Sequence, residues 1–195
     1  MPFVTALRAA RRGRVRVELD GRPWRVLPLE ALVRAGVAEG VALDRPLLRT
    51  LAHELRRTRA LEVGVRALTR RGLSERRLRE RLERAGVAPQ GAEEAVETLR
   101  RSGLVDDARF ASTRAEALAE RGFGNAAIRF DLERQGVRPE QVEAGLLGLD
   151  PEHERAARIV SRRGAGPGTA RYLARRGFDQ EAVEAAAVAA VAPEG

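Results

Sequence analysis

The chain has 195 residues, which allows one ordinary domain or several small units but not two large catalytic domains. Hydrophobic residues make up 44% and charged residues 33%, so a core is available and both disorder and a membrane protein are disfavoured. The net charge is +8, and every basic residue is arginine. Without cysteine or an early apolar run, the sequence predicts a cytoplasmic protein with no disulfide, thiolate zinc site or exported segment.

The exclusive use of arginine has two interpretations. Guanidinium groups stay charged and fork onto phosphates or carboxylates, which suits nucleic acid or an acidic protein. Codon bias in a GC-rich genome would also choose arginine over lysine along the whole chain. Only the net charge and its placement therefore bear on a partner.

The amino-terminal region carries the only strand pattern. Apolar residues alternate on either side of an Asp-Gly pair: Val15, Val17 and Leu19 before Asp20-Gly21, then Trp24 and Val26. Alternation around Asp-Gly predicts a β-hairpin, because the turn needs positive φ at glycine.

Two helices are expected after the hairpin. Pro28 opens a short helical segment that ends near Gly36. Asp44 supplies an N-cap and Pro46 a first-turn proline for a helix over about 45–55. Residues 56–59 fit either a continuation of that helix or a joint.

The rest of the chain is an internal repeat. Each of three segments reads helix, glycine, helix, glycine, helix, and the paired glycines are Gly72 and Gly86, Gly122 and Gly136, Gly164 and Gly177. A glycine after the last periodic residue permits a left-handed helix end. The stretch Leu-Glu-Arg-x-Gly-Val-x-Pro begins at Leu82 and again at Leu132, which favours a true repeat over coincidence.

The predicted fold is mainly α: three tandem three-helix repeats that form an elongated curved body, preceded by a small β-hairpin and helix module. Units of this size stack because none buries its apolar stripe alone. The expected divisions are 1–56 for the module and 57–105, 106–150 and 151–195 for the repeats. Such bodies bind long partners.

Three motifs follow in order along the repeats. Leu104-Val-Asp-Asp-Ala-Arg-Phe-Ala comes first, Arg121-Gly-Phe-Gly with its following helix second, and Leu173-Ala-Arg-Arg-Gly-Phe third. Together they resemble the RecX family, regulators of the bacterial recombinase RecA, over about 58–190. The residues that carry the motifs are Asp106, Asp107, Arg109, Phe110, Gly122, Gly124, Gly136, Gly177 and Phe178, with Gly72 and Gly86 in the first repeat. Asn125 stands where the family commonly has proline.

The resemblance implies a protein that binds in the groove of the RecA–DNA filament and lowers ATP hydrolysis and strand exchange without catalysis of its own. It implies modulation of recombination and the SOS response. We expect a monomer that contacts RecA and, weakly, single- and double-stranded DNA, with no membrane, cofactor or metal.

The residues themselves offer little for chemistry. Asp106 and Asp107 could form half of a metal site, but no third ligand accompanies them, so an N-cap followed by a first-turn acid is the preferred interpretation. The turn-spaced aromatics are expected in the core rather than in a base-stacking platform: Phe110, Phe123, Phe130 and Phe178.

The basic excess lies in the first 105 residues. Residues 1–60 carry a net charge of +7, 61–105 of +3, 106–150 of −3 and 151–195 of +1. The arginines proposed to meet DNA phosphates or the recombinase are Arg11, Arg12, Arg14, Arg16, Arg70, Arg71, Arg76, Arg77, Arg81, Arg121 and Arg129. The alternative for each is a solvated, salt-bridged helix face.

Two classes of function stay open from the sequence. The first is a non-enzymatic regulator in a recombinase filament. The alternative is a free-standing helical DNA-binding protein whose helix pairs read duplex DNA. An enzyme is not expected, because no nucleophile-and-base pair, phosphate loop or ligand cluster stands at a useful spacing.

Overall fold

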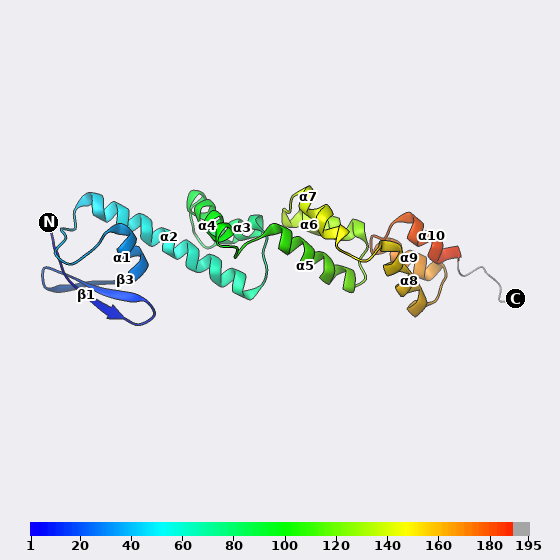
Figure 1. Ribbon diagram of the computed structural model, residues 1–195, viewed down its shortest axis with the longest axis horizontal. Helices are drawn as coiled ribbons and strands as arrows, with labels where there is room; N and C mark the ends of the chain where they lie inside the picture. The colour runs from blue at the N-terminus through cyan, green and yellow to red at the C-terminus, as the bar shows by residue number, and fades with distance from the viewer. Residues whose placement is uncertain (189–195) are drawn as a thin grey trace. The chain divides into compact units, whose positions relative to one another are not determined.

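The computed structural model describes residues 1–188. A three-stranded sheet comes first, and ten helices follow within this range (Figure 1). The contacts divide the chain into two compact units: 1–71 with 78–104, and 72–77 with the residues from 105 onward. The fold is mainly helical with a small sheet at the amino terminus, as expected. Part of the predicted third repeat, 189–195, lies outside the described residues.

The sheet is antiparallel in the order β1 (Val4–Ala10), β2 (Arg14–Leu19) and β3 (Arg22–Pro28). The hairpin of β2 and β3 is confirmed, with Asp20 and Gly21 at φ of 47° and 73° in its turn. The first strand was not predicted, and the hairpin module is in fact a three-stranded sheet. Apart from Val4 and Thr5, its sequence has weak strand propensity because three of its seven residues are alanine, and pairing to β2 holds it in place.

The predicted alternation fails in β3. The register shifts after Val17, which pairs with Arg25, so that Val26 lies opposite Arg16 and Leu27 opposite Val15. Val26 is therefore 44% exposed, and Leu27 is buried in its place. A bulge of this kind moves every later side chain to the other face.

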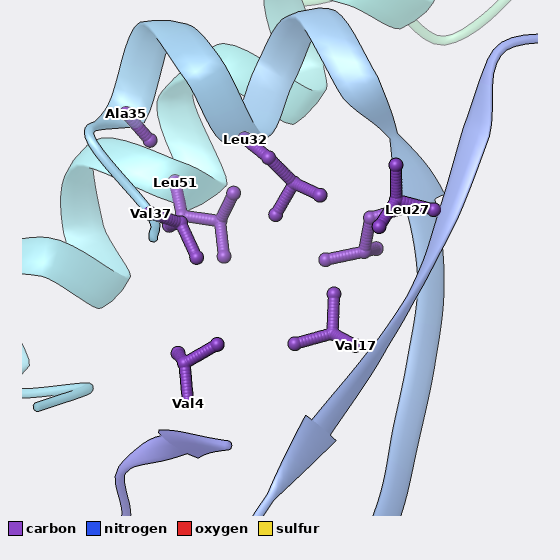
Figure 2. Close-up of a cluster of buried hydrophobic side chains, with 8 residues drawn as sticks. Val4, Val17, Leu27, Leu32, Ala35, Val37 and Leu51 are labelled. Atoms are coloured by element: carbon purple, nitrogen blue, oxygen red, sulfur yellow. The ribbon is translucent and has the colours of Figure 1, made fainter. Parts of the chain in front are cut away.

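The inner face of the sheet packs against α1 (Leu29–Ala35) and α2 (Arg45–Arg70). Figure 2 shows side chains of the sheet, of α1 and of α2 converging on one cluster. Its buried members are Val4, Val15, Val17, Leu27, Leu32, Ala35, Val37 and Leu51. This cluster packs the sheet, α1 and the first half of α2 together within the first unit.

Both predicted helix starts are confirmed, and one end differs. The helix α1 ends at Gly36, whose φ is 76°. The helix α2 begins after Asp44, whose carboxylate accepts a hydrogen bond from the Leu47 amide at 2.8 Å. It continues through 56–59 to Arg70 instead of ending near 55, so there is no joint at the expected start of the first repeat. The four-part division of the chain stays a prediction.

The remaining helices come in the expected order. They are α3 (Glu75–Arg84), α4 (Pro89–Arg101), α5 (Asp107–Glu120), α6 (Asn125–Gln135), α7 (Pro139–Leu147), α8 (Glu152–Arg163), α9 (Pro167–Arg175) and α10 (Gln180–Val188). Most of the paired glycines follow a helix with positive φ, as Gly136 does at 84°. Gly72 is the exception among them, because α2 ends at Arg71 in an extended conformation.

The second and third repeats have separate apolar clusters. In the second, Ile128 and Leu132 of α6 are fully buried against α5 and α7. In the third, Leu173 and Phe178 are buried with Ala156 and Ala182. Phe110 and Phe123 pack at the edge of the second cluster. The expectation for Phe130 was wrong: it is 65% exposed, because it lies on the face of α6 opposite Ile128 and Leu132.

Candidate functional site

The N-terminal arginine cluster, which we define as Arg11, Arg12, Arg14 and Arg16, lies on β2 and on the turn before it. All four are exposed, and the buried Val15 and Val17 alternate with the two on β2. Arg16 stands directly opposite Arg8 on β1. Glu18 neutralises Arg8 at 3.1 Å, whereas the cluster itself pairs with no acidic side chain among residues 1–188. The sheet thus presents unbalanced positive charge.

Three further predicted arginines are exposed within the first unit. Arg70 and Arg71 end α2, and Arg81 lies on the outer face of α3 between the buried Leu78 and Leu82. None of the three forms an ion pair with the described residues. They fit a surface that meets phosphate or carboxylate groups.

Arg76 and Arg77 donate hydrogen bonds to the carboxyl end of α6. Arg77 donates to the Gln135 side-chain oxygen and to the Arg134 carbonyl, both at 2.9 Å, and Arg76 donates to the same carbonyl. Nearby, the Ser74 hydroxyl donates to the Gln135 carbonyl at 2.6 Å. These donors cap the carboxyl end of α6, whose last carbonyls lack helical partners. Both arginines are therefore weaker candidates for an external partner.

The two candidates in the second repeat differ. Arg129 forms a two-pronged ion pair with Glu143, with N–O distances of 2.8 and 3.2 Å. The hydrogen bond from Arg129 holds the pKa of the Glu143 carboxyl below its ordinary value, so both groups stay charged and cancel. Arg121, in contrast, is exposed and pairs with no acid of the described chain.

The Asp-Asp motif joins two helices. Asp106 caps α5, accepting hydrogen bonds from the amides of Ala108 and Arg109 at 2.9 and 3.0 Å, as predicted. The buried Asp107 does more than sit in the first turn, because it accepts from the Glu75 amide at 2.8 Å and so caps α3. Within residues 1–188 no group of three or more acidic, His or Cys side chains could hold a metal ion.

A backbone contact joins the second and third repeats. The Gly124 amide donates to the Arg176 carbonyl at 2.9 Å, and the Ala126 amide donates to the Gly177 carbonyl at 3.1 Å. A Cβ on Gly124 would overlap the backbone of Gly177 and Phe178. Sequence reasoning found both glycines as motif residues but not this contact, since nothing local shows that they meet.

The buried Arg155 forms hydrogen bonds at the same junction between the second and third repeats. It is only 6% exposed, and it donates to the Phe123 carbonyl at 2.9 Å, to the Asp150 carbonyl at 3.0 Å and to the Asn125 side chain. Burial lowers its pKa. Each of its three guanidinium nitrogens donates a hydrogen bond within the chain, so it positions the two repeats. Asn125, at the position where the sequence departs from the family motif, is used in this junction.

No helix within residues 1–188 combines the length and apolar character of a membrane span. The fold and the exposed arginines together define a helical-repeat protein with a basic sheet at its amino terminus.

Comparisons with known proteins agree with this class. Residues 106–146 match the family model described as RecX, second three-helix domain. A crystal structure of regulatory protein RecX superposes with a TM-score of 0.81 at 19% identity, covering 94% of this chain and 98% of that one. A crystal structure of RecX from Lactobacillus salivarius superposes with a TM-score of 0.58 at 14% identity, covering 67% of this chain and 94% of that one. No curated protein matches the sequence significantly.

The matched segment contains the Asp106-Asp107 and Gly122-Gly124 motifs, and the shared fold extends over nearly the whole chain. The family model matches 41 of the 195 residues, and the two RecX structures share the fold of this chain.

Proposed function

We propose that this chain binds the filament that RecA forms on DNA and inhibits its ATP hydrolysis and strand exchange, without catalysis of its own. The match of residues 106–146 to a RecX domain and the fold shared with a RecX structure support RecA as the partner. The observation that carries the proposal is the N-terminal arginine cluster, whose charges have no acidic partner within the described residues. Such a cluster suits a polyanionic filament. On this proposal the protein acts as a cytoplasmic monomer in recombination and the SOS response.

The direct test is an assay of RecA. Added at amounts up to equimolar with RecA, the purified chain should reduce ATP hydrolysis that depends on single-stranded DNA and should reduce strand exchange. Unchanged rates in both assays, together with failure to co-sediment with the filament, would refute the proposal. Tight, sequence-dependent binding to duplex DNA alone would instead favour the free-standing DNA-binding protein.

The cluster provides a residue-level prediction. The triple variant Arg12→Gln, Arg14→Gln, Arg16→Gln should inhibit RecA roughly tenfold less well. The slope of log affinity against log salt for duplex DNA should become shallower by about 0.9 for each lost phosphate contact. Inhibition curves and a salt titration measure the two effects.

A matched control removes the same net charge from neutralised sites. Arg34, Arg79 and Arg100 each form an ion pair with a glutamate, and their replacement by glutamine should leave inhibition within about twofold, because exposed pairs contribute little. Equal loss in the two triple variants would show that net charge, rather than the cluster, decides binding.

A further inference from the structure

Three guanidinium groups alternate with two aromatic rings in the second unit. The Arg121 guanidinium carbon lies 5.6 Å from the centre of the Phe123 ring, and that of Arg176 lies 4.5 Å from it. Arg176 also lies 5.2 Å from the Tyr172 ring, which Arg163 approaches to 4.2 Å. We call these five residues the arginine–aromatic stack. It brings together the end of α5, the end of α8 and α9, which are far apart in sequence.

The stack borders a cavity of about 600 Å³. Arg121, Arg163 and Tyr172 line it, and Arg162 adds a further exposed guanidinium. Arg158 also lines the cavity, but Asp150 neutralises it at 2.7 Å. Glu116 and Glu120 add two carboxylates to the lining, against the three guanidinium groups of Arg121, Arg162 and Arg163. The volume is that of an ordinary small-ligand site, enough for a phosphate group and an adjoining sugar.

The charges of the stack are not balanced within the described chain. Arg121, Arg163 and Arg176 form no ion pair with an acidic side chain of residues 1–188. The ring faces hold the guanidinium groups in place and leave the N–H edges of Arg121 and Arg163 available, whereas Arg176 also donates to the Arg121 carbonyl at 3.4 Å. Like charges gathered in this way repel one another, and an anion in the cavity would relieve the repulsion.

We infer that this cavity binds a phosphodiester group of a nucleic-acid backbone. A single carboxylate satisfies one guanidinium, whereas a nucleic-acid strand brings closely spaced negative charges to several arginines at once. The N-terminal arginine cluster and the exposed Arg70, Arg71 and Arg81 lie in other parts of the chain, so this cavity is a second basic site. The inference deepens the proposed function, on which it rests for its biological setting.

The test measures DNA binding by the full chain without RecA. Fluorescence anisotropy with a labelled oligothymidylate, repeated over a range of salt concentrations, gives affinity and salt slope. The double variant Arg121→Gln, Arg163→Gln should bind roughly tenfold more weakly at low salt. Its slope should be shallower by about 1.4, which is two contacts at about 0.7 each for a single strand.

Further variants separate the effect of net charge from the effect of the Tyr172 ring. Arg34→Gln with Arg79→Gln removes the same net charge from ion-paired sites and should bind like wild type. Tyr172→Leu keeps all charges but frees Arg163 and Arg176, so affinity should fall two- to fivefold with the slope retained, and Tyr172→Phe should restore it. Circular dichroism confirms that each variant is folded.

The outcomes separate this site from the proposed function. Unchanged affinity and slope in Arg121→Gln, Arg163→Gln overturn the inference even if the chain inhibits RecA. Equal competition by polyglutamate and by unlabelled oligothymidylate also overturns it, in favour of an acidic protein segment. A weakened double variant beside a chain that leaves RecA unaffected would keep the site and remove the proposed function.

Discussion

Replacing Gly124 with alanine is expected to lower the free energy of unfolding by about 3 kcal/mol or more. The new methyl group would overlap backbone atoms of Gly177 and Phe178, which cannot move aside as a flexible side chain does. The two amide hydrogen bonds between the repeats, from Gly124 and Ala126, would be lost as well. Urea unfolding of the full chain measures the loss.

A matched glycine provides the control. Gly168 lies in α9, its φ is not positive, and a Cβ there meets no atom within 4 Å. Gly168→Ala should therefore leave stability unchanged or raise it by up to about 1 kcal/mol. Hydrogen exchange in α9 should rise in Gly124→Ala and stay protected in Gly168→Ala. Equal stability of the two variants would show that the repeats do not depend on the close backbone contact.

The second large effect is expected inside α6. Leu132 is fully buried in the cluster of the second repeat. Leu132→Ala should destabilise the protein by about 2–5 kcal/mol, through lost burial and the cavity left behind. Phe130, two residues earlier, is 65% exposed, and Phe130→Ala should cost no more than about 0.5 kcal/mol.

Thermal and urea unfolding of this pair of variants test whether Leu132 or Phe130 is the residue of α6 that is buried in the core. The sequence placed Phe130 in the core because a large aromatic residue is usually buried. A larger loss from Phe130→Ala than from Leu132→Ala would restore that view. It would contradict the position of α6 against α5 and α7.

Sequence patterns predicted the helical elements well, because their causes are local. The N-caps Asp44 and Asp106 and the positive-φ glycine Gly136 each act within one turn of chain, so spacing was enough to place them. The motif around Asp106-Asp107 lies in the segment that matches the RecX domain model. The strand β1 and the end of α2 were missed, because pairing with β2 and packing against the rest of the first unit decide them.

Part of the candidate site could also be predicted from the sequence, and part could not. Composition and charge placement determined that exposed arginines dominate the amino-terminal region and that no cluster of catalytic groups stands in the sequence. Only the tertiary structure showed that Arg129 is neutralised by Glu143, that Arg77 caps α6, and that Arg163 and Arg176 gather beside Arg121.

The physical reason is distance along the chain. An arginine's charge is fixed by its type, but its availability depends on which acid, carbonyl or ring the fold brings within a few ångströms. Arg176 and the Phe123 ring beneath it are 53 positions apart, and so no local pattern could pair them. The sequence by itself determined the helices and the repeat, whereas packing within and between repeats decided which arginines pair with an acidic side chain of the described residues.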